Sequence, residues 1–206
     1  MPVFKSGSNI APSWCEMEYF EIVRLNEGAA LAFERAARKE KFFVCEGRCR
    51  ITQGSRTVTA QPGEVVDFAG EPGPIEVKSF SYHTVLVRVC GHWGEEIGGC
   101  GVFTLDNSAH PQNHGDPADY PRTTDFDNHY HDCDEYWIIY AGRGLAVSEG
   151  VFYEAGAGDC VATACGYHHD FPQVFETIKG VYFETTLQGQ KRLGHLWEHT
   201  HGPGRR

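Results

Sequence analysis

The residues best suited to chemistry lie in two short stretches, His129-Tyr-His131-Asp-Cys-Asp-Glu135 and Gly166-Tyr-His-His169. Side chains on a strand alternate between its faces, so the imidazoles of His129 and His131 should point the same way. A turn over residues 132–134 would return the Glu135 carboxylate toward them. Neutral imidazoles with one carboxylate suit Zn, Mn, Fe or Ni better than Ca or Mg. The pattern therefore predicts a site for one divalent transition metal.

Composition limits what surrounds this site. The chain has 206 residues, 24 glycines and 13% aromatic residues, a mixture typical of short strands joined by tight turns. A net charge of −10 argues against a nucleic-acid or anionic membrane surface. No apolar run approaches the roughly 20 residues that span a bilayer, and no hydrophobic signal region opens the chain, so we expect a cytoplasmic protein. The eight cysteines form no Cys-x-x-Cys pair, and we expect them to be reduced.

The chain also repeats itself. The run that begins at Glu40 matches the run that begins at Glu135, an offset of 135 − 40 = 95 residues. A constant offset over several landmarks indicates two copies of one unit. The landmarks that keep this offset are the pairs Gly47/Gly142, Arg48/Arg143 and Gly63/Gly158.

Each copy is predicted to consist of short strands. Regular spacing with Gly and Pro between the strands indicates an antiparallel sandwich or barrel. The expected strands are 41–45, 48–53, 56–60, 64–68, 76–80 and 84–89 in the first copy, and 136–140, 144–148, 151–154, 159–163, 173–175 and 180–186 in the second. Residues 91–124, rich in Gly, Pro, Asn, Asp and His, break the pattern and are expected to link the units or to cover a barrel mouth.

With these residues in view, the chain resembles the cupin superfamily and is similar throughout to a bicupin. The first cupin motif is Gly, five residues, His-x-His, three or four residues, Glu, six residues, Gly. His129, His131, Glu135 and Gly142 match it, while Thr123 stands at the first glycine.

The second cupin motif is Gly, five residues, Pro-x-Gly, two residues, His, three residues, Asn. Gly158, Gly166 and His169 match it, while Ala164 replaces the proline and Gln173 the asparagine. The resemblance implies that the metal ligands are His129, His131, Glu135 and His169.

The resemblance also implies the fold: an all-β chain of two tandem cupin-type antiparallel β-barrels, each a double-stranded β-helix or jelly roll. We expect a degenerate cupin domain over 1–90, a linker or lid over 91–124, and a metal-binding cupin domain with a C-terminal extension over 125–206. At the offset of 95, Glu34, Ala36, Glu40 and Pro74 stand where the ligands would be, so the first copy should bind no metal. Glu40, among basic neighbours, is expected to be a solvated surface carboxylate.

Three further residues are candidates for catalysis. Glu184 is a candidate general base, and Tyr182 is a candidate proton donor or substrate hydrogen-bond partner, because both share one face of the last strand. That face is either the barrel interior or an exposed edge. His168 is either a general acid or base, a partner of the ligand residues, or a residue that points outward, since its parity is opposite to that of His169.

The other polar residues are not candidates for catalysis. Cys133 is expected to be a turn residue, and His110 and His114 loop residues. Aspartates near the motif are expected either to hold the far nitrogens of the ligand histidines or to be solvated. Lys191 and Arg192 would form either an anion subsite or a solvated turn, and His199 with His201 would form a second His-x-His pair without a partner ligand.

Three functions are compatible with such a site, because a fold does not select a reaction. The first is a metal-dependent enzyme with isomerase, epimerase or lyase-type chemistry on a small polar metabolite, a sugar or a hydroxy- or keto-acid. The second is a mononuclear Fe(II)-type dioxygenase of the bicupin class. The third is a non-catalytic small-molecule binding module. The expected partners are a small-molecule substrate and, as the resemblance implies, a second copy in a homodimer.

Overall fold

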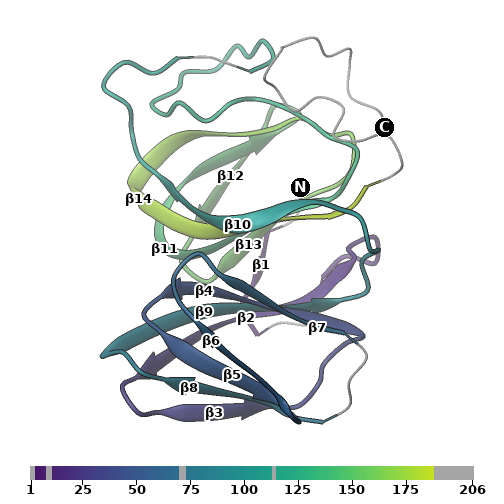
Figure 1. Ribbon diagram of the computed structural model, residues 1–206. Helices are drawn as coiled ribbons and strands as arrows, with labels where there is room; N and C mark the ends of the chain where they lie inside the picture. The colour runs from purple at the N-terminus through teal and green to yellow at the C-terminus, as the bar shows by residue number, and fades with distance from the viewer. Residues whose placement is uncertain (1–2, 8–10, 70–72, 113–114, 188–206) are drawn as a thin grey trace. The chain divides into compact units, whose positions relative to one another are not determined.

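The computed structural model describes residues 3–7, 11–69, 73–112 and 115–187 (Figure 1). Every regular element among them is a β-strand, and neighbouring strands pair antiparallel. No helix long and apolar enough to cross a bilayer occurs in these ranges. The chain divides into two compact units, Ser6–Trp93 and a second one made of Met1–Lys5 with Gly94–Arg206. The all-β, antiparallel barrel fold expected from the sequence is confirmed.

The unit Ser6–Trp93 contains two four-stranded sheets. One sheet has the order β2 (Met17–Asn26), β9 (His83–Gly91), β4 (Lys39–Glu46), β7 (Val65–Ala69), and the other the order β3 (Ala30–Phe33), β8 (Ile75–Ser79), β5 (Cys49–Gln53), β6 (Arg56–Ala60) (Figure 1). Both sheets contribute to one apolar core, in which the ring of Phe42 meets those of Phe33 and Phe68 edge to face at 5.6 and 5.9 Å.

The second unit is built on one larger sheet. Its order is β1 (Val3–Lys5), β13 (Asp159–Thr163), β11 (Glu135–Ser148), β14 (His169–Thr186), β10 (Ile97–Leu105), and β12 (Val151–Gly156) pairs with β11. The long strands β11 and β14 curl around the interior (Figure 1). Their inward apolar residues form a core around Trp137, Phe171 and Ile178.

Bulges explain why β11 and β14 are single strands, whereas each was predicted as two. The β11–β14 register shifts between Ile139 and Ala141 and again three times before Val147. Gly142 lies there with a φ of 80°, and a Cβ on it would come within 1.9 Å of the Thr177 carbonyl oxygen. A glycine at such a bulge lets the strand bend without ending. In the sequence alone, the same glycine indicates the end of a strand.

The pairing registers of the two units repeat. In the first unit Glu40 pairs with Phe68, and in the second Glu135 pairs with Thr163, which keeps the offset of 95 on both strands. Gly47 and Gly142 both have positive φ, 73° and 80°. The sequence repeat therefore corresponds to a repeat of strand pairing and of turn geometry.

The expected segment boundaries differ from the structure at two places. Within 91–124, expected as linker or lid, β10 is a full strand that pairs with β14. Its sequence, IGGCGVFTL, carries three glycines, and this composition hid the strand. Residues Val3–Lys5, expected in the first domain, pair with β13 of the second unit. Strands β2 and β3 were also not predicted.

Glu40 is not the solvated carboxylate expected from its basic neighbours. Glu40 is only 1% exposed. The Arg88 guanidinium donates to its Oε2 from Nε at 3.0 Å and from Nη2 at 2.8 Å. The backbone amide of Ala36 donates to Oε1 at 2.7 Å. Parity on β4 turns Glu40 inward, while Arg88, 48 residues further on, supplies the countercharge.

Candidate metal centre

Backbone bonds bring the four predicted ligands together. His129 and His169, 40 positions apart in the numbering, form an antiparallel bridge in which each amide donates to the other's carbonyl, at 3.1 and 2.8 Å. The Gly166 amide donates to the carbonyl of His131 at 2.9 Å. Glu135 opens β11, and the preceding turn is held by the Thr185 amide, which donates to the Asp134 carbonyl at 2.8 Å. The turn predicted over 132–134 therefore does return Glu135 to the histidines.

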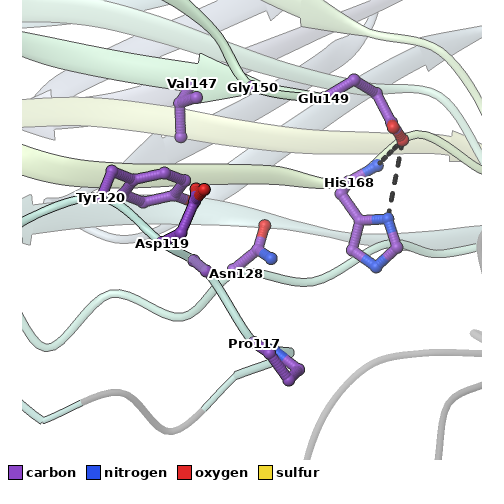
Figure 2. A pocket seen from close by; sticks show the side chains of 9 residues that line it. Pro117, Asp119, Tyr120, Asn128, Val147, Glu149, Gly150 and His168 are labelled. Atoms are coloured by element: carbon purple, nitrogen blue, oxygen red, sulfur yellow. Dashed lines mark hydrogen bonds and ion pairs between the residues drawn. The ribbon is translucent and has the colours of Figure 1, made fainter.

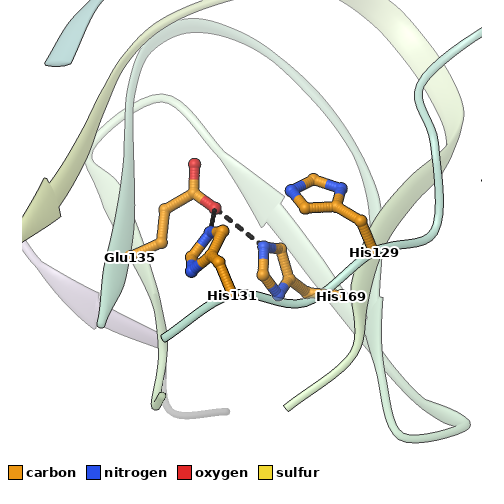
Figure 3. Close-up of side chains that lie close together, drawn as sticks. All are labelled: His129, His131, Glu135 and His169. Carbon is orange, nitrogen blue, oxygen red and sulfur yellow. Dashed lines mark hydrogen bonds and ion pairs between the residues drawn. The ribbon is translucent and has the colours of Figure 1, made fainter. Parts of the chain in front are cut away.

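The four side chains converge in a buried cluster (Figure 3). Oε2 of Glu135 lies 3.0 Å from Nε2 of His131 and 2.7 Å from Nε2 of His169. One ligand atom from each residue lies within 4.8 Å of every other. None of the four residues is more than 5% exposed.

The far nitrogens fix the tautomer of each ring. Nδ1 of His129 donates to the Asp127 carbonyl at 2.9 Å, that of His131 to the Cys133 carbonyl at 3.0 Å, and that of His169 to the Tyr167 carbonyl at 2.8 Å. A carbonyl oxygen only accepts, so each Nδ1 carries hydrogen and each neutral ring presents its Nε2 lone pair to the cluster. Backbone carbonyls, rather than the aspartate side chains considered above, fill this role.

This donor set fits a divalent transition metal. Three Nε2 lone pairs and a carboxylate, all buried, would repel one another unless a cation or added protons lay among them. Two donors about 2.1 Å from an ion and at right angles to one another lie about 3 Å apart, close to the spacings of Glu135 from His131 and His169. His129, His131, Glu135 and His169 are thus the residues that would hold the ion.

Burial and the contacts among these residues shift the pKa values of three of them. Burial lowers the pKa of His131, but hydrogen bonds to Cys133 and Glu135 outweigh it, and the pKa lies well above its usual value. Burial raises the pKa of Glu135, but hydrogen bonds from His131 and His169 pull it well below its usual value. Burial and the neighbouring His169 lower the pKa of His129.

Trp137 anchors the carboxylate ligand. Its indole Nε1 donates to Oε1 of Glu135 at 2.7 Å, leaving Oε2 toward the histidines. Its ring also packs against Phe126 at 5.2 Å and against the His169 ring at 5.3 Å. Sequence reasoning missed this residue, although Trp137 stands two positions after Glu135 and therefore shares its face of the strand.

A cavity of about 220 Å³ opens beside the cluster. Tyr182 and Glu184 line it, which resolves the choice left open between barrel interior and exposed edge. Strand pairing sets Tyr182 opposite Trp137 and Glu184 opposite Glu135. The other lining residues are Phe103, Phe126, Asp127, His129, Glu135 and Trp137.

Glycines on β10 make room for the two candidate catalytic side chains. Gly99 pairs with Glu184, and Gly101 pairs with Tyr182. A Cβ on Gly98 would come within 2.5 Å of Glu184 Oε2, and one on Gly101 within 3.0 Å of the Tyr182 ring. These positions are therefore glycine because the side chains from β14 occupy the space.

His168 is not among the residues lining this cavity, so its proposed role as acid or base there is not supported. Its Nε2 lies 2.9 Å from Oδ2 of Asp116, and its Nδ1 3.6 Å from Oε1 of Glu149, in a separate hollow. The physical reason is parity: His168 precedes His169 on extended chain and faces the other way.

Cys133 lies in the bend before Glu135, as expected, but its side chain is not exposed there. Its side chain is fully buried, and Sγ lies 3.3 Å from Nδ1 of His131. Burial raises the pKa of the Cys133 thiol, while the bond to His131 opposes this. His110 is exposed, as expected for a loop residue. The remaining polar candidates, His114, Lys191, Arg192, His199 and His201, lie outside the described residues.

Comparison with known proteins agrees with this fold. No family model matches the chain. Solved structures share the fold at low sequence identity: AerE from Microcystis aeruginosa (8% identity, TM-score 0.57, covering 81% of this chain and 86% of that one), oxalate decarboxylase from Bacillus subtilis (10%, 0.52, 80% and 68%) and vicilin from hazelnut, Corylus avellana (10%, 0.53, 91% and 80%).

The chain therefore shares its fold with these solved structures, and its ligand cluster is a potential centre for a divalent metal. A curated relative, "Uncharacterized protein y4oW" of Sinorhizobium fredii, is 43% identical over 203 residues, which are 98% of this chain and 93% of that protein. The chain belongs to the same family as y4oW.

Proposed function

We propose that this protein is a metal-dependent cupin enzyme that carries out isomerase, epimerase or lyase-type chemistry on a small polar metabolite. The observation that carries the proposal is the joint placement of three Nε2 lone pairs and the Glu135 carboxylate beside a cavity that also holds Glu184 and Tyr182. A non-catalytic module would need neither the open metal positions nor the additional acid and phenol.

The roles of the chain's own residues follow from the geometry. A bound metal would supply Lewis-acid charge that stabilises negative charge developing on a substrate oxygen. Glu184, 3% exposed and on the cavity wall, accepts the proton removed from the substrate. Tyr182 holds the substrate or returns a proton from its hydroxyl. Trp137 keeps Glu135 oriented toward the cluster.

Cavity size and charge narrow the substrate class. A volume of about 220 Å³ admits only a small metabolite, and four lining residues, Phe103, Phe126, Trp137 and Tyr182, carry aromatic rings of Phe, Trp or Tyr. Three lining residues, Asp127, Glu135 and Glu184, are acidic, and no Lys or Arg lines the described part of the cavity. An uncharged polyol, sugar or hydroxy-carbonyl compound fits better than a carboxylate, whose charge only the metal would offset.

The metal is proposed from the same donor set. Manganese is one candidate, since the oxalate decarboxylase of B. subtilis is described by its Mn(II) centres. Zn, Fe and Ni accept the same ligands. Elemental analysis of protein purified without chelators or a histidine tag should find about one such ion per chain.

We also propose that both units are cupin domains, with metal binding confined to the second. The repeated registers and the paired glycines support this. Arg88, which bonds to Glu40 and to the carbonyl of Glu34, brings its charge to the place that corresponds to the ligand cluster. The homodimer and the cytoplasmic location stay predictions.

Proton transfer separates the proposed chemistry from the alternatives. Metal-loaded protein, incubated in D₂O with small sugars and hydroxy-ketones, should exchange a carbon-bound proton of its substrate, and Glu184→Gln should abolish the exchange while keeping the metal. Thr186→Ser, two residues further along β14, is the matched control. Oxygen consumption coupled to substrate loss would instead indicate a dioxygenase, and binding without exchange or turnover would indicate a binding module.

A further inference from the structure

A second hollow, of about 450 Å³, lies in the metal-binding unit (Figure 2). Asn128 and His168 line it, and each precedes a metal ligand, His129 or His169, on extended chain. Neighbouring side chains on such a chain face opposite ways, so this hollow shares no lining residue with the cavity beside the cluster. Its volume is in the range of small-molecule sites.

The charge in the hollow is negative. Asp119 and Glu149 line it, and Asp116 lies directly behind the His168 imidazole, 2.9 Å from Nε2. No Lys or Arg contributes to the part of the wall that the structure describes. The nearby Arg122 is engaged with the buried Asp170 carboxylate. A ligand for this hollow should therefore be a cation.

Asn128 offers a hydrogen-bond acceptor to the hollow. Its residue is 8% exposed, and Nδ2 donates to the Asp116 carbonyl at 3.3 Å, which sets the orientation of the amide. Oδ1 then faces the hollow and accepts from no group among the described residues (Figure 2). This oxygen is open to the hollow, so a ligand that brings an N–H or O–H group can donate to it.

Glu149 has a backbone conformation that glutamate rarely adopts. It has a φ of 49° and is followed by Gly150 at 77°, in the two-residue turn between β11 and β12. Asn-Gly suits such a turn better than Glu-Gly. The Glu149 carboxylate instead accepts from the His168 amide at 2.9 Å and lies 3.6 Å from Nδ1 (Figure 2). The side chain thus serves the hollow rather than the turn.

From these observations we infer that the hollow binds an organic ammonium group, carried either by a free diamine or by a lysine side chain. The ammonium donates to Oδ1 of Asn128 and is neutralised by the carboxylates of Asp119 and Glu149. Its methylene chain lies against the ring of Tyr120 and the side chain of Val147.

Calorimetric titration of the full-length, metal-loaded protein tests this assignment. The probes are 1,4-diaminobutane, Nα-acetyl-lysine amide and, as the uncharged control, 1,4-butanediol. At least one of the amines should bind and the diol should not. Asp119→Asn, at an exposed position where folding is not at risk, should weaken amine binding about tenfold. Glu154→Gln removes the same charge from an exposed site on β12 outside the hollow and should change the affinity less than twofold.

The comparison of probes also identifies the source of the ammonium group. Tighter binding of the diamine points to a free amine metabolite, and tighter binding of the acetylated lysine points to a protein side chain. If neither amine binds, if the diol binds as well as the diamine, or if the two variants weaken binding equally, the hollow is not an ammonium site.

Discussion

The carboxylate of Glu40 and the guanidinium of Arg88 form a paired, buried contact, with Nε and Nη2 both donating to Oε2 at 3.0 and 2.8 Å. Glu40 corresponds by strand register to Glu135, the carboxylate of the candidate metal centre. Arg88 packs over the rings of Phe33 and Phe42, at 4.8 and 5.8 Å from their centroids. In the first unit, the Arg88 guanidinium therefore neutralises the carboxylate. At the corresponding place in the second unit, the carboxylate lies in a cluster suited to a metal ion.

Breaking this pair from one side should destabilise the first unit strongly. Glu40→Ala leaves the buried Arg88 with Glu21 as its remaining ion-pair partner, and Arg88→Ala leaves the buried Glu40 with Arg35 at 3.3 Å. Loss of the main partner of a buried charge costs up to about 3–5 kcal/mol. The double variant Glu40→Leu/Arg88→Leu should recover much of that loss. Urea unfolding followed by circular dichroism measures the effect. If each single variant loses less than 1 kcal/mol, the pair does not hold the unit together.

The same variants test the separation of roles between the two units. Folded Glu40→Ala protein should keep its metal content unchanged, because its position contributes no ligand to the centre at Glu135. The metal contents of the two proteins are compared by elemental analysis, at a temperature at which the destabilised variant is still folded. Loss of metal from folded Glu40→Ala protein would contradict the assignment of the site to the second unit.

Removal of one metal ligand should abolish metal binding and leave the barrel folded. His131→Ala deletes one of the three imidazole donors and should reduce the metal content from about one ion per chain to almost none. His110→Ala, an exposed histidine in a loop, is the matched control and should keep full occupancy. Full occupancy in His131→Ala protein would show that the ion binds elsewhere.

Trp137 should affect the metal affinity only through its hydrogen bond to Glu135. Trp137→Phe keeps an aromatic ring in the core but removes the Nε1 donor to Oε1 of Glu135. Loss of such a supporting bond typically weakens metal affinity about 10- to 100-fold. Competition with a chromogenic chelator measures the change. Trp93→Phe, also a buried tryptophan but in the other unit, should leave the affinity as it is.

The sequence predicted the ligand cluster because its signals are local. His129, His131 and Glu135 lie within seven residues, and strand alternation with one turn is enough to bring them together. The choice of His169 over His168 rested on the family motif, and in the structure His169 lies in the ligand cluster while His168 faces the other hollow.

What the sequence did not reveal depends on long-range pairing. Arg88 reaches Glu40 only because β4 and β9 are adjacent, and Glu40 therefore looked solvated among its basic neighbours. The glycines of β10 resembled a loop, since their purpose, to leave room for Tyr182 and Glu184, is visible only once β14 lies beside them. The bulges in β11 likewise hid the continuity of that strand.

The buried thiols should make stability fall at alkaline pH. Burial raises the pKa of Cys45 to about 12, of Cys49 to about 11 and of Cys90 to about 12, from an ordinary value near 9. The folded chain therefore holds these protons more tightly than the unfolded chain does. Stability that is fully present below pH 9 is lost as the pH rises from 9 toward 11 to 12, by about 1.4 kcal/mol per pH unit for each thiol.

Cysteine variants isolate this effect from other alkaline titrations. A Cys45→Ala/Cys49→Ala/Cys90→Ala protein should show a clearly shallower decline of the free energy of unfolding between pH 9 and pH 10.5. Cys100→Ala/Cys165→Ala, at two partly exposed positions, serves as the control and should decline more nearly like the unmodified protein. Equal slopes in all three proteins would mean that the buried thiols titrate alike in the folded and unfolded chains, and that burial does not protect them.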